Sequence, residues 1–191
     1  MNRFAFHDLQ LFYRLVKTHC GDVGVLWVNK GSEPSVVSIF LPRPDVSMDT
    51  FITDIYPGAA ARDHRGMTGL CDRIGRYMAG EDIDLPVSLL DLDLCYEFQR
   101  RVLLKAREIP RGRVIPYGRL AQRIGAPRAA RAVGTAMAKN PFPLVLPCHK
   151  VIRASGDVGN FGSGPIMKRT LLGIEGVDVS DEGRVDGRFF W

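Results

Sequence analysis

At 191 residues, the chain is long enough for one large domain or two small ones, each with its own core. Hydrophobic residues make up 46% and charged residues 25%, as in an ordinary globular protein, and no apolar stretch approaches the ~20 residues of a membrane span. The net charge of +5 conceals a basic segment, because residues 96–176 hold 15 Lys and Arg against 4 Asp and Glu. Such a segment is typical of a protein that binds a polyanion, although a solvated charged surface is the alternative.

The four cysteines predict a reducing compartment. Cys20, Cys71, Cys95 and Cys148 are widely separated and form no C-x-x-C pair, which argues against a zinc ribbon and against a disulfide framework. The first residues show neither a long apolar core nor a small-residue cleavage site, so no secretory signal is expected. We therefore expect an intracellular protein.

The N-terminal part of the chain, up to about residue 65, is predicted to be rich in β-structure. Residues 24–28 and 35–41 are runs of β-branched and aromatic residues, and residues 29–32 between them predict a hairpin turn. Residues 66–80 have the periodicity of a helix. The apolar residues on one face of that helix are Met67, Leu70, Ile74, Tyr77 and Met78.

The second half of the chain is predicted to be mainly helical. A first helix, with Phe98, Val102, Leu103 and Ala106 at helical spacing, ends at residues 110–112. A short helix over 117–124, a glycine-containing turn over 125–127 and a helix over 128–138 follow, which is the pattern of a helix-turn-helix. The predicted divisions of the chain are an N-terminal domain (1–85), a linker (86–94), a DNA-binding domain (95–177) and a C-terminal tail (178–191).

The second helix of this pair is poor in bulky side chains. Its small residues, which let the backbone of a helix approach another surface closely, are Ala129, Ala130, Ala132, Gly134 and Ala136. Basic side chains that can contact phosphates flank the two helices: Arg119, Arg123, Arg128, Arg131 and Lys139. An alanine-rich helix packed inside the domain is the alternative, but the two features together favour DNA binding.

Cys148 is the candidate nucleophile. It follows the apolar run 142–146, which predicts a buried strand that Pro147 ends. His149 comes next, and the glycine-rich loop 155–164 has the composition of a flexible lid. A reactive thiol needs a nearby cation or base to lower its pKa from ~8.5, whereas the other three cysteines are expected to be buried as small hydrophobes. Because neighbouring side chains of an extended chain point apart, contact between the thiol and His149 needs a turn or a bridging water.

A histidine base needs a third group that orients its imidazole. Glu175 is the best candidate, because it is one of two acidic residues within residues 111–176. An exposed residue at a helix end is the alternative. Asn140 is either part of a helix stop or an amide that reaches the turn at Cys148.

Residues 96–176 resemble the O6-alkylguanine-DNA alkyltransferases, also called methylated-DNA–protein-cysteine methyltransferases. The shared motifs are Ile109-Pro110-Arg111-Gly112, Pro116-Tyr117-Gly118, Arg131-Ala132-Val133-Gly134, Asn140-Pro141, Pro147-Cys148-His149, Gly159-Asn160-Phe161 and Lys168 through Leu171-Leu172 to Glu175-Gly176. The N-terminal half matches only in its layout of strands, one helix and a linker. The resemblance implies an α+β fold. Its N-terminal α/β domain would be ribonuclease H-like, with a small antiparallel sheet and a helix, and its mainly helical, winged helix-turn-helix-like C-terminal domain would carry the cysteine.

The resemblance also implies DNA repair by direct reversal. The helix-turn-helix would enter the minor groove of double-stranded DNA, and Arg131 would fill the space of a flipped-out O6-alkylguanine, where flipping costs a few kcal/mol. Cys148 would take the alkyl group from this base, and from O4-alkylthymine, in one irreversible turnover. His149 would accept the thiol proton through a water.

The other site residues follow from the same resemblance. Glu175 would orient His149, Asn140 would steady the turn at Cys148, and Tyr117 would donate a proton or hydrogen bond to the leaving guanine. The DNA contacts would be Tyr117, Arg119, Arg128, Ala129, Ala130, Arg131 and Lys139. The substrate pocket would be lined by Met137, Pro143, Val151, Val158, Gly159, Asn160, Phe161, Gly162 and Ser163.

The resemblance further implies a protein that needs no cofactor and no obligate protein partner. The zinc site of some family members has no clear equivalent in Cys20, Cys71 and the N-terminal histidines, so no metal is expected. The protein would act as a cytoplasmic monomer associated with the nucleoid, or as a nuclear protein in a eukaryote. It would have no contact with a membrane.

Three positions depart from the family pattern. Lys150 stands where the family usually has arginine. A compact ammonium group therefore replaces a planar guanidinium, which can donate two parallel hydrogen bonds to a carboxylate. Phe161 and Gly162 stand where tyrosine and serine are common, so two pocket hydroxyls are absent, although the Gly162 N–H can still reach O6.

Two other functions compete with this one. A non-catalytic DNA-lesion-binding or regulatory protein would use the same helix-turn-helix, but it would not need Cys148. A cysteine hydrolase built on Cys148, His149 and Glu175 would turn over repeatedly, and it would leave the basic helix-turn-helix unexplained.

Overall fold

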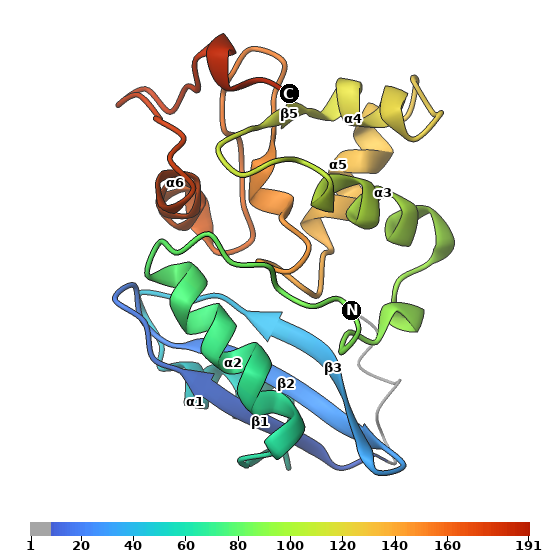
Figure 1. Cartoon of the computed structure of the whole chain (residues 1–191), viewed down its shortest axis with the longest axis vertical. Coiled ribbons are helices and arrows are strands. Elements are labelled where there is room, and N and C mark those ends of the chain that lie inside the picture. The colour runs from blue at the N-terminus through green and yellow to red at the C-terminus, as the bar shows by residue number, and fades with distance from the viewer. Residues whose placement is uncertain (1–8) are drawn as a thin grey trace. The chain divides into compact units, whose positions relative to one another are not determined.

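The computed structural model describes residues 9–191. The chain up to Leu94 forms one compact unit and Cys95–Trp191 a second, and both contain helices and strands, so the fold is mixed α/β (Figure 1). The first unit contains β1 (Leu11–Val16), β2 (Val23–Lys30), β3 (Glu33–Phe40), α1 (Met48–Ile55), β4 (Ala60–Ala61), α2 (Arg65–Met78) and η2 (Leu92–Leu94). The second contains α3 (Glu97–Arg107), β5 (Ile115–Pro116), α4 (Tyr117–Arg123), α5 (Ala130–Ala138), η3 (Cys148–Lys150), β6 (Val151–Ile152), α6 (Gly164–Ile174) and η4 (Gly187–Phe189). Within residues 9–191, no helix is both long and apolar enough to cross a membrane.

The sheet of the first unit has the strand order β3-β2-β1-β4. β2 pairs antiparallel with β1 and β3, whereas the short β4 runs parallel to β1. The predicted hairpin is confirmed, because β2 and β3 pair as far as Lys30 and Glu33. Gly31 in the turn has φ +66°, a conformation that glycine adopts without steric cost.

Helices lie on both faces of this sheet (Figure 1). α2 confirms the helix predicted over 66–80, and the five apolar residues named for its inner face are all buried. On the other face, Met48 and Ile52 of α1 pack in one cluster with Leu26 and Val28 of β2. The sequence pattern did not predict α1, because a helix of eight residues offers only two turns of periodicity.

The segment 87–94 belongs to the hydrogen-bonding pattern of the first unit. Val36 N–H of β3 donates to Leu89 O at 2.7 Å, and Asp91 N–H donates to Val36 O at 2.8 Å. The Lys30 ammonium lies 2.9 Å from the Asp91 carboxylate. Residues expected to form a linker are therefore bonded to the edge of the sheet.

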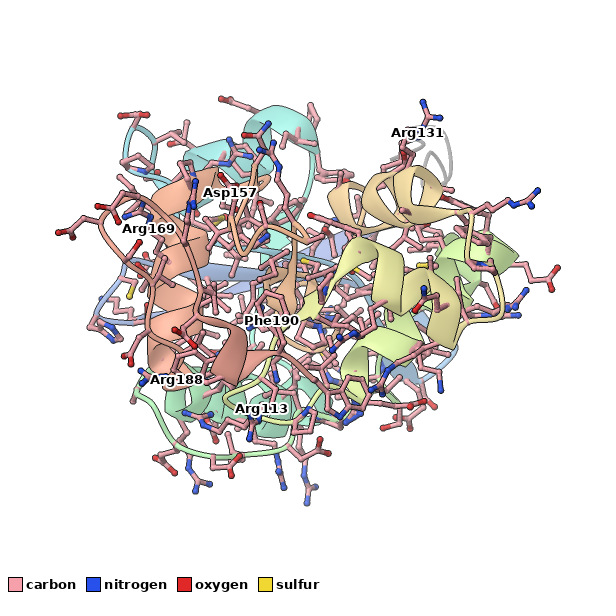
Figure 2. The ribbon with its side chains drawn as sticks, turned by 90° about the horizontal axis from the view of Figure 1, so that it is seen from above. Arg113, Arg131, Asp157, Arg169, Arg188 and Phe190 are labelled. Carbon is pink, nitrogen blue, oxygen red and sulfur yellow. The ribbon has the colours of Figure 1, made fainter. Side chains whose placement is uncertain are left out.

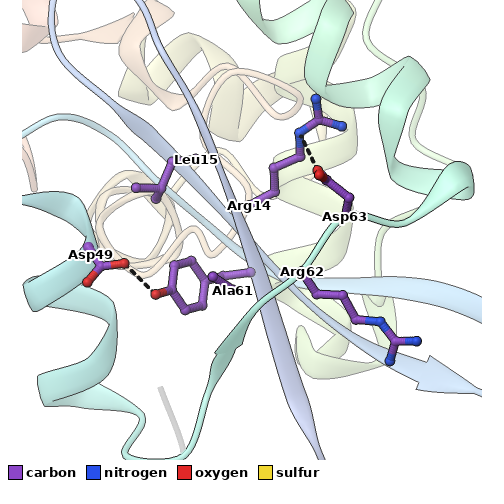
Figure 3. A pocket seen from close by; sticks show the side chains of 7 residues that line it. Arg14, Leu15, Asp49, Ala61, Arg62 and Asp63 are labelled. Atoms are coloured by element: carbon purple, nitrogen blue, oxygen red, sulfur yellow. Dashed lines mark hydrogen bonds and ion pairs between the residues drawn. The ribbon is translucent and has the colours of Figure 1, made fainter.

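A solvent-exposed cavity of about 320 Å³ lies beside β1 and β4 (Figure 3). The Tyr13 hydroxyl donates a hydrogen bond to Asp49, and this bond, with burial and the charge of Asp49, raises the pKa of Tyr13 to about 12. Arg14 Nε lies 3.4 Å from an Asp63 carboxylate oxygen. Four of the polar groups of the cavity are thus paired with one another, whereas the Arg62 guanidinium carbon lies 4.7 Å from the centre of the Phe12 ring.

The second unit contains the predicted helix-turn-helix, made by α4 and α5. Gly125 has φ +73° in the turn between them, and α3 packs against both helices. α5 begins at Ala130, so Arg128 and Ala129, which were predicted to be helical, precede it. A second, two-stranded sheet pairs β5 with β6 in parallel.

Residues 142–146 are buried as predicted, but the prediction of a strand is wrong. They form a turn in which Leu146 N–H donates to Phe142 O at 2.9 Å and Leu144 has φ +71°. Pro143 removes one backbone donor that a strand would use. An apolar run alone does not distinguish a buried strand from a buried turn, because both exclude water equally.

Candidate active site

Cys148 is the first residue of η3, and it is 6% exposed. Its N–H donates to Leu146 O at 2.8 Å, so the turn 142–146 holds the nucleophile's backbone. β6 follows η3 directly, and its partner β5 runs straight into α4. The thiol therefore lies close in the fold to the first helix of the helix-turn-helix.

Asn140 supports the turn before Cys148 with both ends of its amide. Its Nδ2 donates to Leu146 O at 2.7 Å, and its Oδ1 accepts from Phe142 N–H at 3.0 Å. The side chain also hydrogen-bonds the Cys148 sulfur, which acts to lower the pKa of the thiol. Of the two alternatives at the sequence level, the geometry matches an amide that reaches the turn.

His149, Glu175 and Lys150 form a buried network. His149 Nε2 lies 3.0 Å from Glu175 Oε1, and Lys150 Nζ lies 2.6 Å from Glu175 Oε2. Lys150 also donates to Ile109 O at 3.2 Å, just before the start of the Pro110 turn. Lysine at position 150 thus makes an ion pair with the carboxylate that contacts His149.

Burial dominates the protonation of this network. It raises the pKa of Cys148 and lowers the pKa of His149, because both charged forms lose their hydration. Burial also acts to raise the pKa of Glu175, but the hydrogen bond with His149 and the charge of Lys150 outweigh it, and the net shift is downward. The resting site therefore holds a neutral thiol, a neutral imidazole and an ionised carboxylate, so His149 can accept a proton.

Lys168 is a site residue that the sequence did not single out beyond its place in a motif. It is 1% exposed, and its ammonium donates to Val151 O at 2.7 Å and to Val158 O at 2.6 Å. Burial lowers the pKa of Lys168 to about 8, while a charge on Cys148 acts in the opposite direction. The spacing of Lys168 from Cys148 along the chain does not predict that their charges interact, because the two residues come near each other only when α6 packs beside η3.

Tyr117, the first residue of α4, is close enough for its charge to interact with that of Cys148. Burial raises the pKa of Tyr117, and the Cys148 charge raises it further. A Cβ atom on Gly134 of α5 would lie 3.9 Å from the Tyr117 ring. The small residue of α5 thus faces the tyrosine that starts α4.

The predicted pocket residues fall into two groups. Met137, Pro143, Val151 and Val158 are buried, whereas Asn160 and Gly162 are exposed and Gly159, Phe161 and Ser163 are half-buried. Lys168 Nζ lies 5.9 Å from the centre of the Phe161 ring, which places Phe161 on the same side of the site.

The glycine-rich loop is held by hydrogen bonds at its base and is not a free lid there. Arg153 N–H donates to Asp157 O at 3.0 Å, and Gly159 N–H donates to Asp157 Oδ1 at 2.6 Å. Gly156 and Gly159 have φ +86° and +71°, so the glycines allow a tight turn.

The predicted DNA-binding side chains lie mostly on the surface of the second unit. Arg128, Arg131 and Lys139 are exposed, and Arg131 projects outward from α5 in Figure 2. Ala129 and Ala130 are half-buried at the start of α5. Arg119, also exposed, differs from the others because its guanidinium donates to Trp191 O at 2.9 Å.

Comparison with known proteins shows which proteins this chain is similar to. The family model "6-O-methylguanine DNA methyltransferase, DNA binding domain" matches residues 97–177. A methylated-DNA–protein-cysteine methyltransferase of Methanothermobacter thermautotrophicus is 36% identical over 161 residues, which cover 84% of this chain and 83% of that protein. One from Mycolicibacterium paratuberculosis is 46% identical over 112 residues, which cover 58% of this chain and 66% of that protein.

Solved structures extend the similarity to three dimensions. The crystal structure of Mycobacterium tuberculosis OGT in complex with DNA has a TM-score of 0.68 and 32% identity, over 86% of this chain and 92% of that one. A crystal structure of a substituted form of the same OGT has a TM-score of 0.69 and 31% identity, over 93% of this chain and 96% of that one. With a relative this similar along most of both sequences, the chain belongs to the methylated-DNA–protein-cysteine methyltransferase family of DNA-repair proteins.

Proposed function

We propose that this protein repairs O6-alkylguanine in double-stranded DNA, and O4-alkylthymine as well, by transferring the alkyl group irreversibly to Cys148. The observation that carries the proposal is the position of the buried Cys148 thiol, at the start of η3, which leads into the strand whose partner runs into α4. This position supports a nucleophile that works together with the helix-turn-helix. A hydrolase of small substrates would have no use for such an arrangement.

The helix-turn-helix delivers the lesion to the site. Arg128, Arg131 and Lys139 are exposed and basic, as contacts with phosphates require. Arg131 inserts into the base stack from the minor groove and occupies the space of the flipped nucleotide. Flipping costs a few kcal/mol, and less for a base that pairs poorly because it is alkylated.

The flipped base enters a pocket between α5, the turn 142–146 and the glycine-rich loop. Met137 and Val158 supply buried apolar surface, and Phe161 stacks near the base. The complete pocket set is Met137, Pro143, Val151, Val158, Gly159, Asn160, Phe161, Gly162 and Ser163.

In the transfer step the Cys148 sulfur attacks the alkyl carbon in line with the C–O6 bond. An S–C bond forms, the C–O6 bond breaks, and its electron pair stays on the guanine oxygen. The thiol proton passes to His149 through a water, Tyr117 gives its own proton to the guanine, and His149 then returns a proton to Tyr117 through water. One alkyl group is thus exchanged for one proton.

Electrostatics favour this step in the transition state. The neutral His149 accepts the proton, and the ionised Glu175 stabilises the imidazolium that forms. Lys168 provides a fixed positive charge near the developing thiolate, in an environment from which water is largely excluded. Lys168 acts on the charge of the sulfur, so it contributes only when the thiol loses its proton.

Each molecule acts once, because a thioether offers no route back to the thiol without another nucleophile. The reaction draws on no cofactor or metal, and we propose a monomer that works where chromosomal DNA lies, in the cytoplasm with the nucleoid or in a eukaryotic nucleus. We further propose that the first unit is ribonuclease H-like, which the order β3-β2-β1-β4 supports, and that the second is a winged helix-turn-helix variant.

Intact and peptide mass measurement after incubation with a duplex bearing O6-methylguanine tests the proposal. We expect one added methyl group, located on Cys148, and repair that stops at one lesion per protein molecule. Cys148→Ala should abolish the transfer, whereas Cys20→Ala, at a half-exposed cysteine of the first unit, should leave it unchanged. A methyl group on another residue or repeated turnover would contradict the mechanism, and lesion binding without a change in mass would indicate non-catalytic recognition.

A further inference from the structure

The last residues of the chain, 178–191, are paired near their midpoint with the glycine-rich loop. Val185 N–H donates to Gly156 O at 2.9 Å, and Val158 N–H donates to Gly183 O at 3.0 Å. We call residues 178–191 the C-terminal strap. Its backbone therefore binds the two loop residues on either side of Asp157, within the wall of the proposed pocket.

Side-chain packing reinforces this junction. Val185 and Val158 are buried in one cluster with Ile152, the last residue of β6. Gly156 lies so close to the strap that a Cβ atom would lie 2.7 Å from Val185 O, and its φ is +86°. The loop and the strap thus form one packed layer in which a larger residue at position 156 has no space.

The C-terminal end of the strap is anchored to the helix-turn-helix. Trp191 N–H donates to Val114 O at 2.8 Å beside β5, and Figure 1 shows the C-terminus next to that strand. The Arg119 guanidinium donates to Trp191 O, and the Arg123 guanidinium carbon lies 3.5 Å from the centre of the Trp191 ring. Both arginines belong to α4.

The residues just before Trp191 add a contact beside the strand that precedes α4. Val114 N–H donates to Phe189 O at 2.9 Å, and Phe189 and Phe190 pack against the same cluster as Val185. Phe190 lies at the centre of the view in Figure 2. The strap is therefore a continuous connection from the pocket loop to α4.

We propose that the C-terminal strap is a positioning element for alkyl transfer, which holds the pocket wall in place by anchoring it to α4. This inference rests on the proposed function and assigns a role to residues outside the catalytic network. Val158 O already accepts a hydrogen bond from Lys168, so the strap and α6 hold the same residue from two directions. Loss of one support lets the wall move relative to the Cys148 sulfur.

The test compares the rate at which Cys148 is methylated by free O6-methylguanine and by O6-methylguanine in a duplex. The free base does not contact the helix-turn-helix, so its rate reports the pocket alone. Gly156→Ala should lower both rates about tenfold or more, because small displacements of reacting groups are costly. Trp191→Ala, far from the pocket, should lower the free-base rate about threefold through the strap.

Matched controls separate positioning from stability. Gly173→Ala in α6 and Gly69→Ala in α2 each add a Cβ atom that meets no atom within 4 Å. Both should react at the unsubstituted rate. The final methylated fraction should stay complete in every variant, since a positioning role changes the rate and not the number of active molecules.

Two results would overturn the inference. If Trp191→Ala reacts with the free base at the unsubstituted rate, the anchor at α4 does not hold the pocket wall. If the variants lose active fraction at an unchanged rate, the strap only stabilises the fold. Failure of the unsubstituted protein to accept a methyl group from the duplex would instead refute the proposed function, and the role of the strap with it.

Discussion

The cavity beside β1 and the surroundings of Cys148 both bring a tyrosine together with acidic and basic side chains, but they differ in exposure. The Asp63 side chain, which pairs with Arg14, is 88% exposed, whereas the side chains of Glu175 and Lys150 are 2% and 8% exposed. Water screens the first pair and leaves it a small contribution to stability. Around Cys148 the charged groups have lost their hydration, so each is stable only beside a partner of opposite charge. Burial, more than residue type, therefore shifts the pKa values there and suits the second region to catalysis.

The two regions should differ most in how much the free energy of unfolding falls when one carboxylate is removed. Glu175→Gln leaves the Lys150 ammonium buried without its ion pair, so we expect the free energy of unfolding to fall by about 3–5 kcal/mol. Asp63→Asn in the cavity should change it by about 0.5 kcal/mol or less. Urea denaturation of both variants at pH 7 measures the contrast, and equal losses would refute the importance of burial.

Acidification should reproduce the Glu175 effect in the unsubstituted protein. The pKa of Glu175 is lowered in the folded state from its ordinary 4.5, so its contribution is fully present above about pH 4.5 and is lost as the pH falls toward the folded value. The Glu175→Gln variant should lack this part of the acid dependence. If its pH profile parallels that of the unsubstituted protein, Glu175 is not ionised in the folded site.

A smaller effect is expected at Lys168. Lys168→Met should slow methylation by the free base by about tenfold at pH 7, since it removes a fixed positive charge beside the sulfur. The pKa of Lys168 is about 8, so the unsubstituted protein loses this charge as the pH rises through that value. The ratio of the two rates should therefore fall toward one above pH 8.

Arg14→Met, which removes a cation from the cavity, is the matched control for this experiment. It should leave the methylation rate unchanged at every pH. A ratio for Lys168→Met that stays constant from pH 6 to pH 9 would show that the lysine acts only by holding the carbonyls of Val151 and Val158.

The smallest effect is expected for Lys150→Arg. Arginine keeps the positive charge beside Glu175, so stability should change by about 1 kcal/mol or less. Lys150→Met, which removes the charge, should be clearly more destabilising. Thermal unfolding of the two variants measures the difference. If Lys150→Arg loses as much stability as Lys150→Met, the limiting factor is the room for a larger side chain and not the charge at position 150.

Much of the fold was predictable because periodicity reports which face of an element is buried. The hairpin of β2 and β3, the helix α2 and the helix-turn-helix all follow from spacing, and the structure confirms them. α1 was missed because it is short. The strand predicted over 142–146 was wrong because an apolar run records burial and not backbone conformation.

The nucleophile motif, the basic helix-turn-helix and the family to which the chain belongs could all be identified from the sequence. They depend on which residues occur at which spacing along the chain. The fold was needed to show that Lys168 is buried near Cys148, that Lys150 shares Glu175 with His149, and that the strap reaches from Gly156 to α4. Such contacts join residues far apart in the chain, and their energies come from burial and hydrogen-bond geometry that exist only after packing.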